Sequence, residues 1–367
     1  KGLLIARQEL VVVSAYEVVE SLLRVVAVLS LALLPGDLLV LWTAIAFGVR
    51  LVVTLLPAAH CLVRFPESRP RPAAVAWRAV RRIGGYAGWA TLGNIAMRLR
   101  AQGGLLLLNV SFDEVVSGGY AIAARLSTQQ TGFALAFQRT VQPAIVSGHA
   151  RGETGRIHTL GMVADKYLLL ALSFVLVPLW LDTGGILHLW LGPYPPHTAE
   201  LTRLVLAWTT VPLFTRSFIL ALRTHGPIAH YTRVQLALAV LTLLLAAAWF
   251  GWLRLAPWAL PVTSLVMELA LTAFNVLVVG RKVGMRAGPW WAETVRPVLL
   301  ATLPAVLAAA ALRWTMEPGL ARVGAITGAY AVVAAPLVWL VGLEGWERRL
   351  FGGFATRVVA GLRDRAA

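Results

Sequence analysis

The sequence predicts an all-α, polytopic membrane protein with about ten transmembrane helices, and three observations support this fold class. Hydrophobic residues make up 58% of the 367 residues, charged residues only 14%, and the mean hydropathy is +0.73. Because soluble domains carry about 25% charged residues, this composition argues against a water-soluble enzyme. The apolar residues also gather into long segments, and the positive residues are distributed unevenly between the loops that join them.

The individual spans follow from the length of these apolar segments. A helix needs about 20 apolar residues to cross a bilayer core. By this rule the sequence predicts spans at residues 11–34, 38–62, 83–109, 116–145, 167–190, 201–222, 232–253, 258–280, 297–315 and 323–343. Turn residues separate neighbouring spans, as in Pro35-Gly36-Asp37 and the Gly- and Pro-rich run 192–196.

The orientation follows from the loops. Most of the 33 Lys and Arg residues fall on one side, at 1–7, 64–82, 151–166, 223–233, 281–296 and in the tail. The opposite loops hold only Arg254, Arg313 and Arg322. The excess of positive residues in cytoplasmic loops therefore predicts that both termini are cytoplasmic. The net charge of +16 is then explained mainly by topology, and we expect no nucleic-acid partner.

Two basic segments interrupt the hydrophobic pattern. Residues 64–82 are rich in Arg and Pro and predict a cytoplasmic linker that ends in a short surface helix, with a domain boundary at this point. In the tail, 346–367, apolar residues recur every four positions and arginines lie between them. This pattern predicts an amphipathic helix at the surface of anionic lipid, with a solvated tail as the alternative.

The sequence carries no sign of enzymatic chemistry. Cys61 is the single cysteine, the histidines have no metal-ligand spacing, and neither a phosphate-binding glycine loop nor a nucleophile elbow is found. We therefore expect no enzyme activity, no metal and no cofactor. The chain begins at Lys1 without a signal-peptide pattern, which suggests a fragment of a longer protein.

Arginines within the spans are the strongest functional signal. Each costs about 2.5–3.5 kcal/mol at the centre of a lipid-exposed helix, so they must face water, pair with acids or reach the interface. Guanidinium groups also bind phosphate in a forked geometry. The predicted substrate-binding residues, which include polar neighbours on the same helical stripes, are Arg50, Asn94, Arg98, Arg125, Gln129, Arg139 and Arg216. Structural ion pairing of the whole set is the alternative, and we expect it for Arg24 and Arg203.

The acids suggest different roles. Glu20 and Arg24 are spaced four residues apart and predict an internal ion pair. Glu268 lies at the centre of a polar stripe in span 258–280, with no cation in its own helix interior. It is therefore a candidate either for a salt bridge with an arginine of another span or for coupling of ion movement to transport.

Several loose motifs resemble one family when taken in order. They are Ala6-Arg7-Gln8-Glu9, the Tyr16 to Arg24 stretch, Gly36-Asp37, Gly118-Gly119-Tyr120-Ala121, Gln142-Pro143-Ala144, Lys166-Tyr167, Leu189-Trp190-Leu191-Gly192 and a short turn at Gly226. Together they resemble the polysaccharide and O-antigen flippases of the multidrug/oligosaccharidyl-lipid/polysaccharide (MOP) exporter superfamily.

The resemblance implies a MOP/MATE-like helical bundle in which the first four of fourteen helices are missing, so that the first lobe is incomplete. Residues 1–63 would be the last two helices of that lobe, 64–82 the linker, 83–283 a six-helix second lobe, 284–345 two additional helices, and 346–367 the interfacial tail. The location implied is the bacterial inner membrane.

The resemblance also implies the activity. The substrate would be an undecaprenyl-pyrophosphate-linked oligosaccharide, translocated for O-antigen, capsule or exopolysaccharide synthesis by alternating access of an arginine-lined cavity. The implied partners are this lipid-linked substrate, membrane lipids, a polysaccharide polymerase and glycosyltransferases. The alternatives are a multidrug-type exporter of the same fold and a non-transporting membrane component of a polysaccharide assembly complex.

Overall fold

The computed structural model describes residues 3–4, 7, 9–31, 37–68, 77–150, 154–225 and 228–349. Every regular element in these residues is helical. The chain divides into two compact units, Lys1–Arg82 and Ile83–Ala367, and the division falls at the end of the predicted linker. Part of that linker (69–76) and most of the predicted amphipathic tail (350–367) lie outside the described residues.

The first unit is a helical hairpin. Helix α2 (Leu10–Leu31) packs on α3 (Leu38–Arg64), which a short 3-10 turn, η1 (Pro66–Ser68), follows. At the open end, where α2 begins and α3 ends, Leu4, Val13 and Cys61 form a small core, and the Tyr16 hydroxyl and His60 Nδ1 share a hydrogen bond of 2.6 Å. The end of the hairpin that carries Cys61 is therefore fixed by buried contacts.

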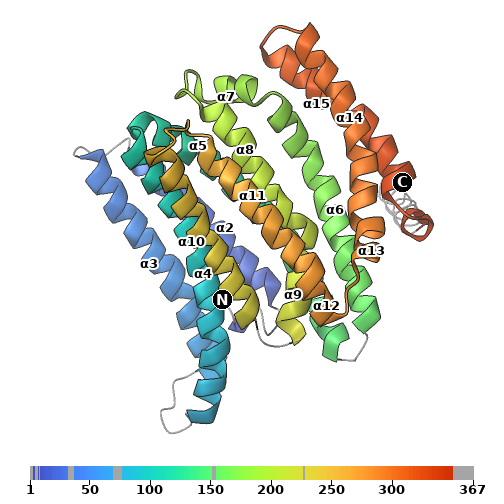
Figure 1. Ribbon diagram of the computed structural model, residues 1–367. Helices are drawn as coiled ribbons and strands as arrows, with labels where there is room; N and C mark the ends of the chain where they lie inside the picture. The colour runs from blue at the N-terminus through green and yellow to red at the C-terminus, as the bar shows by residue number, and fades with distance from the viewer. Residues whose placement is uncertain are drawn as a thin grey trace, which may run out of the picture. The chain divides into compact units, whose positions relative to one another are not determined.

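The second unit contains the remaining helices, which Figure 1 shows as a series of long antiparallel segments. They are α4 (Trp77–Ser111), α5 (Glu114–Ala150), α6 (Thr154–Leu181), α7 (Thr183–Leu191), α8 (Thr198–Thr210), α9 (Arg216–His225), α10 (Ala229–Gly251), α11 (Ala259–Phe274), α12 (Gly280–Val283), α13 (Ala287–Trp290), α14 (Arg296–Thr315) and α15 (Leu320–Leu337). Although α4 begins at Trp77, most of it belongs to this unit.

Two helix groups can be distinguished within this unit. Helices α6, α14 and α15 lie together at the right of Figure 1 and share a core that includes Leu181, Ile326 and the fully buried Tyr330. A second core, which includes Leu108, Tyr120 and Leu260, joins α4, α5, α8, α10 and α11. Small residues allow close approach here: a Cβ on Gly104 would lie 3.1 Å from Leu260.

Several helices change their winding without ending. The 3-10 segment η3 (Val211–Thr215) follows α8 and contains Pro212, which lacks the backbone N–H that a regular helix requires. Five-residue π-helical turns follow α11, α13 and α15, at η4 (Asn275–Val279), η5 (Trp291–Val295) and η6 (Val338–Gly342). Such turns are often found at functional sites because they re-aim side chains and free backbone groups.

The helices agree with the predicted membrane class. Seven segments of the described residues are long and apolar enough to cross a membrane, which makes this a multi-pass membrane protein by length and composition. Helices also lie at the other predicted spans, 11–34, 83–109 and 116–145, but they are outside this set. All three carry interior charges, such as Glu20, Arg98 and Arg125. The count of ten spans therefore remains a prediction.

One predicted span is displaced along the chain. The apolar helix runs over His158–Leu181, whereas the sequence pattern placed the span at 167–190. Asp182 separates α6 from the short helix α7, so no single helix covers the predicted range. The pattern was wrong here because Asp165 and Lys166 were interpreted as loop residues, although both are buried inside the unit.

Candidate functional site

A buried ion pair lies in the interior of the second unit. The Arg100 Nη1 atom of α4 is 2.7 Å from the Glu268 Oε2 atom of α11, and the two side chains are 15% and 4% exposed. The Arg100 guanidinium also stacks over the ring of Trp208 from α8, 4.3 Å from the ring centroid. Three helices therefore meet at one cation, and the arginine charge is neutralised by an acid of the same unit.

The predicted polar stripe of α11 explains why Glu268 points inward. Ser264 and Glu268 are 2% and 3% exposed, and Asn275, at the start of η4, is 3% exposed. Residues four positions apart share a helix face, so this face turns toward the bundle and the apolar face toward lipid. The structure thus confirms the salt-bridge role for Glu268, while ion coupling through this residue remains a prediction.

Further polar side chains continue this layer beside the helix break at η3. Gln130 of α5 donates to the Thr210 hydroxyl at 2.8 Å and accepts from the Thr209 hydroxyl at 2.9 Å. On the other side of the break the Asn275 amide donates to the Thr215 hydroxyl at 3.2 Å. These bonds join α5, α8, η3 and η4 at the level where the helix is interrupted.

A second acid supports the start of α9. The Asp165 carboxylate of α6 accepts a 2.9 Å hydrogen bond from the Ser217 backbone N–H. Arg216, which is half-buried, is close enough to Asp165 for an electrostatic attraction. An acid near a helix N-terminus also compensates the helix dipole. Arg216, one of the predicted substrate-binding residues, is therefore engaged at least in part by a structural acid.

The other predicted residues of this unit lie on its surface. Arg98 and Arg125 are exposed, and no Asp or Glu of the described residues forms an ion pair with either. Asn94, Gln129 and Arg139 are also exposed. Arg98 and Arg100 are thus separated by two positions and point to different environments, the surface and the buried pair.

Asn94 additionally lines a polar cavity of about 230 Å³ between α4, α9 and α10. Gln235, Thr232, Tyr231 and Arg223 line the same cavity, and Arg233 lies over the Trp89 ring beside it, 5.1 Å from the centroid. Of the predicted site residues in this unit, the structure therefore brings Asn94 to this cavity and Arg216 to a smaller one of about 20 Å³ that Asp165 also lines. It does not gather the predicted set around one point.

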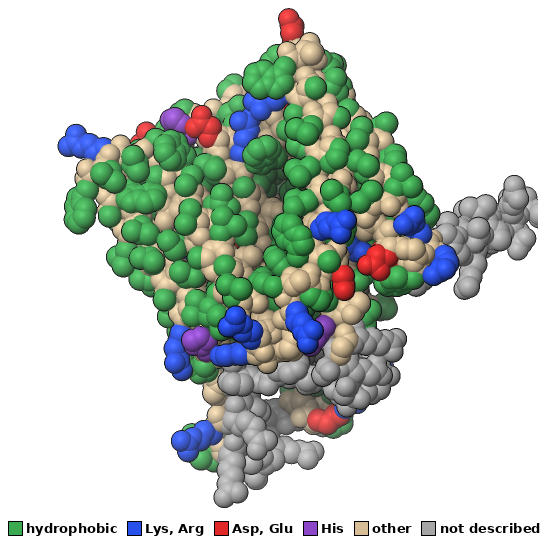
Figure 2. All heavy atoms as spheres, turned by 45° about the vertical axis from the view of Figure 1, so that its right-hand side comes forward, with side chains coloured by type: hydrophobic (Ala, Val, Ile, Leu, Met, Phe, Trp, Pro, Cys, Tyr) green, Lys and Arg blue, Asp and Glu red, His purple; other side chains and the backbone are tan. Residues whose placement is uncertain are grey.

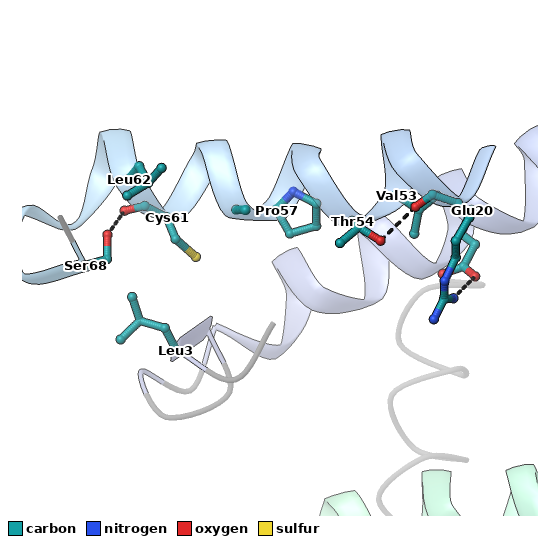
Figure 3. Close-up of a pocket in the computed structure, with 10 residues that line it drawn as sticks. Leu3, Glu20, Val53, Thr54, Pro57, Cys61, Leu62 and Ser68 are labelled. Atoms are coloured by element: carbon teal, nitrogen blue, oxygen red, sulfur yellow. Dashed lines mark hydrogen bonds and ion pairs between the residues drawn. The ribbon is translucent and has the colours of Figure 1, made fainter. Parts of the chain in front are cut away.

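Arg50 belongs to the first unit and lines a cavity of about 510 Å³ between α2 and α3, together with Thr54 and Cys61. Figure 3 shows Thr54, Pro57 and Cys61 along α3, with Glu20 at one end of the cavity and Leu3 at the other. Glu20 bonds to Arg24, as predicted, and its Oε1 atom is 3.9 Å from the Arg50 Nη1 atom. Two guanidinium groups therefore share one carboxylate, and Arg50 remains 72% exposed.

Sequence reasoning missed Arg100, Trp208 and Gln130 as members of the buried layer. The sequence indicated that Glu268 could pair with an arginine of another span. Which arginine forms the pair depends on how the helices are rotated relative to each other. Among the described residues no group of three or more His, Cys, Asp or Glu side chains could hold a metal ion. The chain matches no protein-family model, no curated protein and no solved structure.

Proposed function

We propose that this chain forms part of a membrane transporter that translocates a lipid-linked oligosaccharide carrying a pyrophosphate group. The observation that carries the proposal is the exposure of Arg98 and Arg125 on helices α4 and α5, without acid partners among the described residues. Each would cost about 2.5–3.5 kcal/mol against lipid at mid-membrane. These surfaces are better suited to a hydrated cavity that receives an anion.

The neighbours of these arginines support a polar wall. On α4, Asn94, Arg98 and Gln102 follow one another at four-residue spacing and all are exposed. On α5, Arg125, Gln129 and Arg139 are also exposed, and they extend over about 21 Å of helix. Cations flanked by amide donors can replace the water that a pyrophosphate loses on entering the membrane, as midplane sites do in other transporters.

The acids favour an anionic over a cationic cargo. An exporter of cationic drugs needs a carboxylate that is free to receive the drug, but the Glu268 carboxylate is 2.7 Å from Arg100 and nearly fully buried. In the first unit Glu20 is shared between Arg24 and Arg50. The acids near the candidate cations are therefore occupied, whereas several cations remain exposed.

The break between α8 and α9 supplies a mechanism for alternating access. The 3-10 segment η3 has fewer regular hydrogen bonds than an α-helix and meets the polar layer through Thr210 and Thr215. In the proposed cycle the anion binds to the arginine stripes from the cytoplasmic side, and helices pivot at such breaks to open the cavity to the other side. The arginines screen the pyrophosphate throughout.

The test uses the chain in proteoliposomes together with a fluorescent polyprenyl-pyrophosphate-linked sugar. Translocation is read as protection of the fluorophore from a membrane-impermeant quencher. We expect Arg98→Ala and Arg125→Ala to reduce the rate at least tenfold, while the exposed Arg281→Ala keeps the wild-type rate. Arg98→Lys should recover part of the activity, because lysine keeps the charge but loses the forked geometry.

Three results would contradict the proposal. Wild-type translocation rates in both arginine variants would show that these cations have no role in transport. Transport of a lipophilic cation, with no transport of the pyrophosphate lipid, would favour the multidrug-type exporter. If the chain binds the pyrophosphate lipid but moves none of it, the non-transporting component of an assembly complex is the better description.

A further inference from the structure

An apolar groove of about 340 Å³ runs along the second unit between α6, α8 with η3, and α14. Figure 2 shows a hollow between hydrophobic ridges on the face that brings α14 forward, with basic side chains at its upper end. Leu172, Leu176, Phe214, Leu299 and Val306 are among its lining residues. The groove does not include the exposed arginines Arg98 and Arg125 of the transport proposal, although it borders the helix break at η3.

The few hydroxyl groups in the groove do not make it polar. Thr302 donates to the Val298 carbonyl at 2.7 Å, and Ser173 donates to the Leu170 carbonyl at 2.6 Å. The Thr210 hydroxyl is likewise bonded to the Leu206 carbonyl and to Gln130. Because each hydroxyl already has a partner, what the groove offers to an occupant is hydrocarbon surface.

The length of the groove fits one leaflet. Its lining on α6 extends from Leu169 to Trp180, which is about 16 Å at 1.5 Å per residue. Half of a bilayer core is about 15 Å thick. Trp180 at one end is 46% exposed, and Trp314, beyond the groove on α14, is 86% exposed. Exposed indole rings favour the headgroup level, so this end of the groove corresponds to the interface.

Two arginines stand at that same end. Arg203 lies one helical turn from the lining residue Ala207, and its backbone carbonyl accepts a 3.2 Å hydrogen bond from the Trp180 indole. Arg313 lies two turns beyond Val306 on α14 and is close enough to Arg203 for their charges to repel. The Arg203 side chain bonds to the neutral Thr183 hydroxyl at 3.3 Å.

Two acids, Asp182 and Glu200, attract Arg203 electrostatically, but neither forms an ion pair with it. Asp182 is held by Arg322 through two hydrogen bonds of 2.6 and 2.9 Å, and both its oxygens are used. No Asp or Glu of the described residues forms an ion pair with Arg203 or Arg313. The end of the apolar groove thus carries two neighbouring guanidinium groups that have no ion-pair partner among the described residues, an arrangement that a phosphate would stabilise.

We propose that this groove binds one anionic glycerophospholipid, with its phosphate on Arg203 and Arg313 and one acyl chain between α6, α8 and α14. The bound lipid would fill the space between the α14–α15 pair and the rest of the second unit. This assigns a ligand-binding role to Arg203, for which the sequence suggested a structural one. The proposal does not depend on the identity of the transported substrate.

The test measures binding of phosphatidylglycerol to the purified full chain by native mass spectrometry. Two variants remove the two halves of the site: Arg203→Ala/Arg313→Ala removes the charges, and Ala207→Phe fills the groove. We expect each to weaken binding about tenfold or more, which is the effect of losing charge-assisted hydrogen bonds or the chain contacts. The matched controls are Arg281→Ala for charge and Ala247→Phe, at an exposed position on α10, for bulk.

Every other pattern overturns the proposal. Unchanged binding in both variants would mean that lipid binds elsewhere. Weakening by the charge variant alone would indicate a phosphate site without a chain groove, which competition by inorganic phosphate would then reveal. Weakening by Ala207→Phe alone would indicate a groove for uncharged chains. Intact folding of each variant is checked by gel filtration in the same detergent.

Discussion

Lys166 and Glu347 lie 181 positions apart in the chain, yet they form a bidentate ion pair whose two bonds are 2.7 and 2.8 Å long. Their side chains are 1% and 0% exposed. Glu347 also accepts a 2.6 Å hydrogen bond from the Glu344 backbone N–H. This pair fixes the short helical segment at residues 345–349, which follows η6, onto α6. It therefore holds the last described residues against the rest of the second unit.

Removing the lysine should release that segment. In Lys166→Met the Glu347 carboxylate is left buried without its cation, a change that typically costs about 3–5 kcal/mol. We expect trypsin to cleave at Arg348 and Arg349 about 100-fold faster or more, since cleavage follows the population of the opened state. Lys282→Met, at an exposed lysine, is the control. Equal cleavage rates in both variants would show that the pair does not anchor the segment.

The Arg100–Glu268 pair should show strong coupling in a double-mutant cycle. Arg100→Met leaves Glu268 unpaired at 3% exposure and should lower the apparent unfolding temperature in detergent by several degrees. Arg100→Met/Glu268→Met should be more stable than either single variant, because no charge remains buried. Arg98→Met, two positions away and exposed, should stay near wild type. Additive effects of the two single substitutions would argue against a direct interaction.

Two adjacent glycines in α5 should respond in opposite ways. A Cβ on Gly119 would lie 2.6 Å from the Thr198 hydroxyl, which is itself bonded to the Pro195 carbonyl, so Gly119→Ala should destabilise the unit by about 1–3 kcal/mol. A Cβ on Gly118 would meet nothing within 4 Å, and Gly118→Ala should stabilise the helix by up to about 1 kcal/mol. Thermal unfolding of both variants checks the order, and a stable Gly119→Ala protein would refute the close α5–α8 contact.

The stabilisation that the Arg322–Asp182 pair provides should depend on its forked geometry as well as on its charge. Arg322 donates from Nε and Nη2 to the two carboxylate oxygens, a fork that lysine cannot form. We therefore expect stability to fall in the order wild type, Arg322→Lys, Arg322→Ala, with the alanine variant lower by about 3 kcal/mol. The same two substitutions at exposed Arg281 should have no effect. If the lysine variant equals wild type, the forked contact contributes nothing beyond its charge.

The spans that the sequence predicted well are those with uninterrupted apolar runs. The helix at Ala229–Gly251 and the span Leu320–Gly342 lie within a few residues of the predicted 232–253 and 323–343. The span at 167–190 was displaced because Lys166 and Asp165 were taken as loop residues. Their burial depends on Glu347 and Ser217, which are far away in the chain. Local hydropathy carries no information about such distant partners.

The candidate site was predictable only in part for the same reason. The spacing of Ser264, Glu268 and Asn275 was sufficient to predict a buried polar face, because that face is a property of one helix. Which residue pairs with Glu268, in contrast, depends on how two helices pack against each other. Both Arg98 and Arg100 lie in the same predicted span. The rotation of α4 about its own axis decides that Arg100 points inward and Arg98 outward.

That division between Arg98 and Arg100 has a consequence for how the membrane voltage acts on the protein. Moving one elementary charge through the full potential is worth about 2.3 kcal/mol per 100 mV. Arg100 and Glu268 form a neutral pair, so a helix movement that carries both transfers no net charge and feels little of the field. A movement of exposed Arg98 or Arg125 relative to the bilayer does transfer charge, unless a bound anion cancels it. Voltage should therefore bias the empty protein more strongly than the anion-bound one.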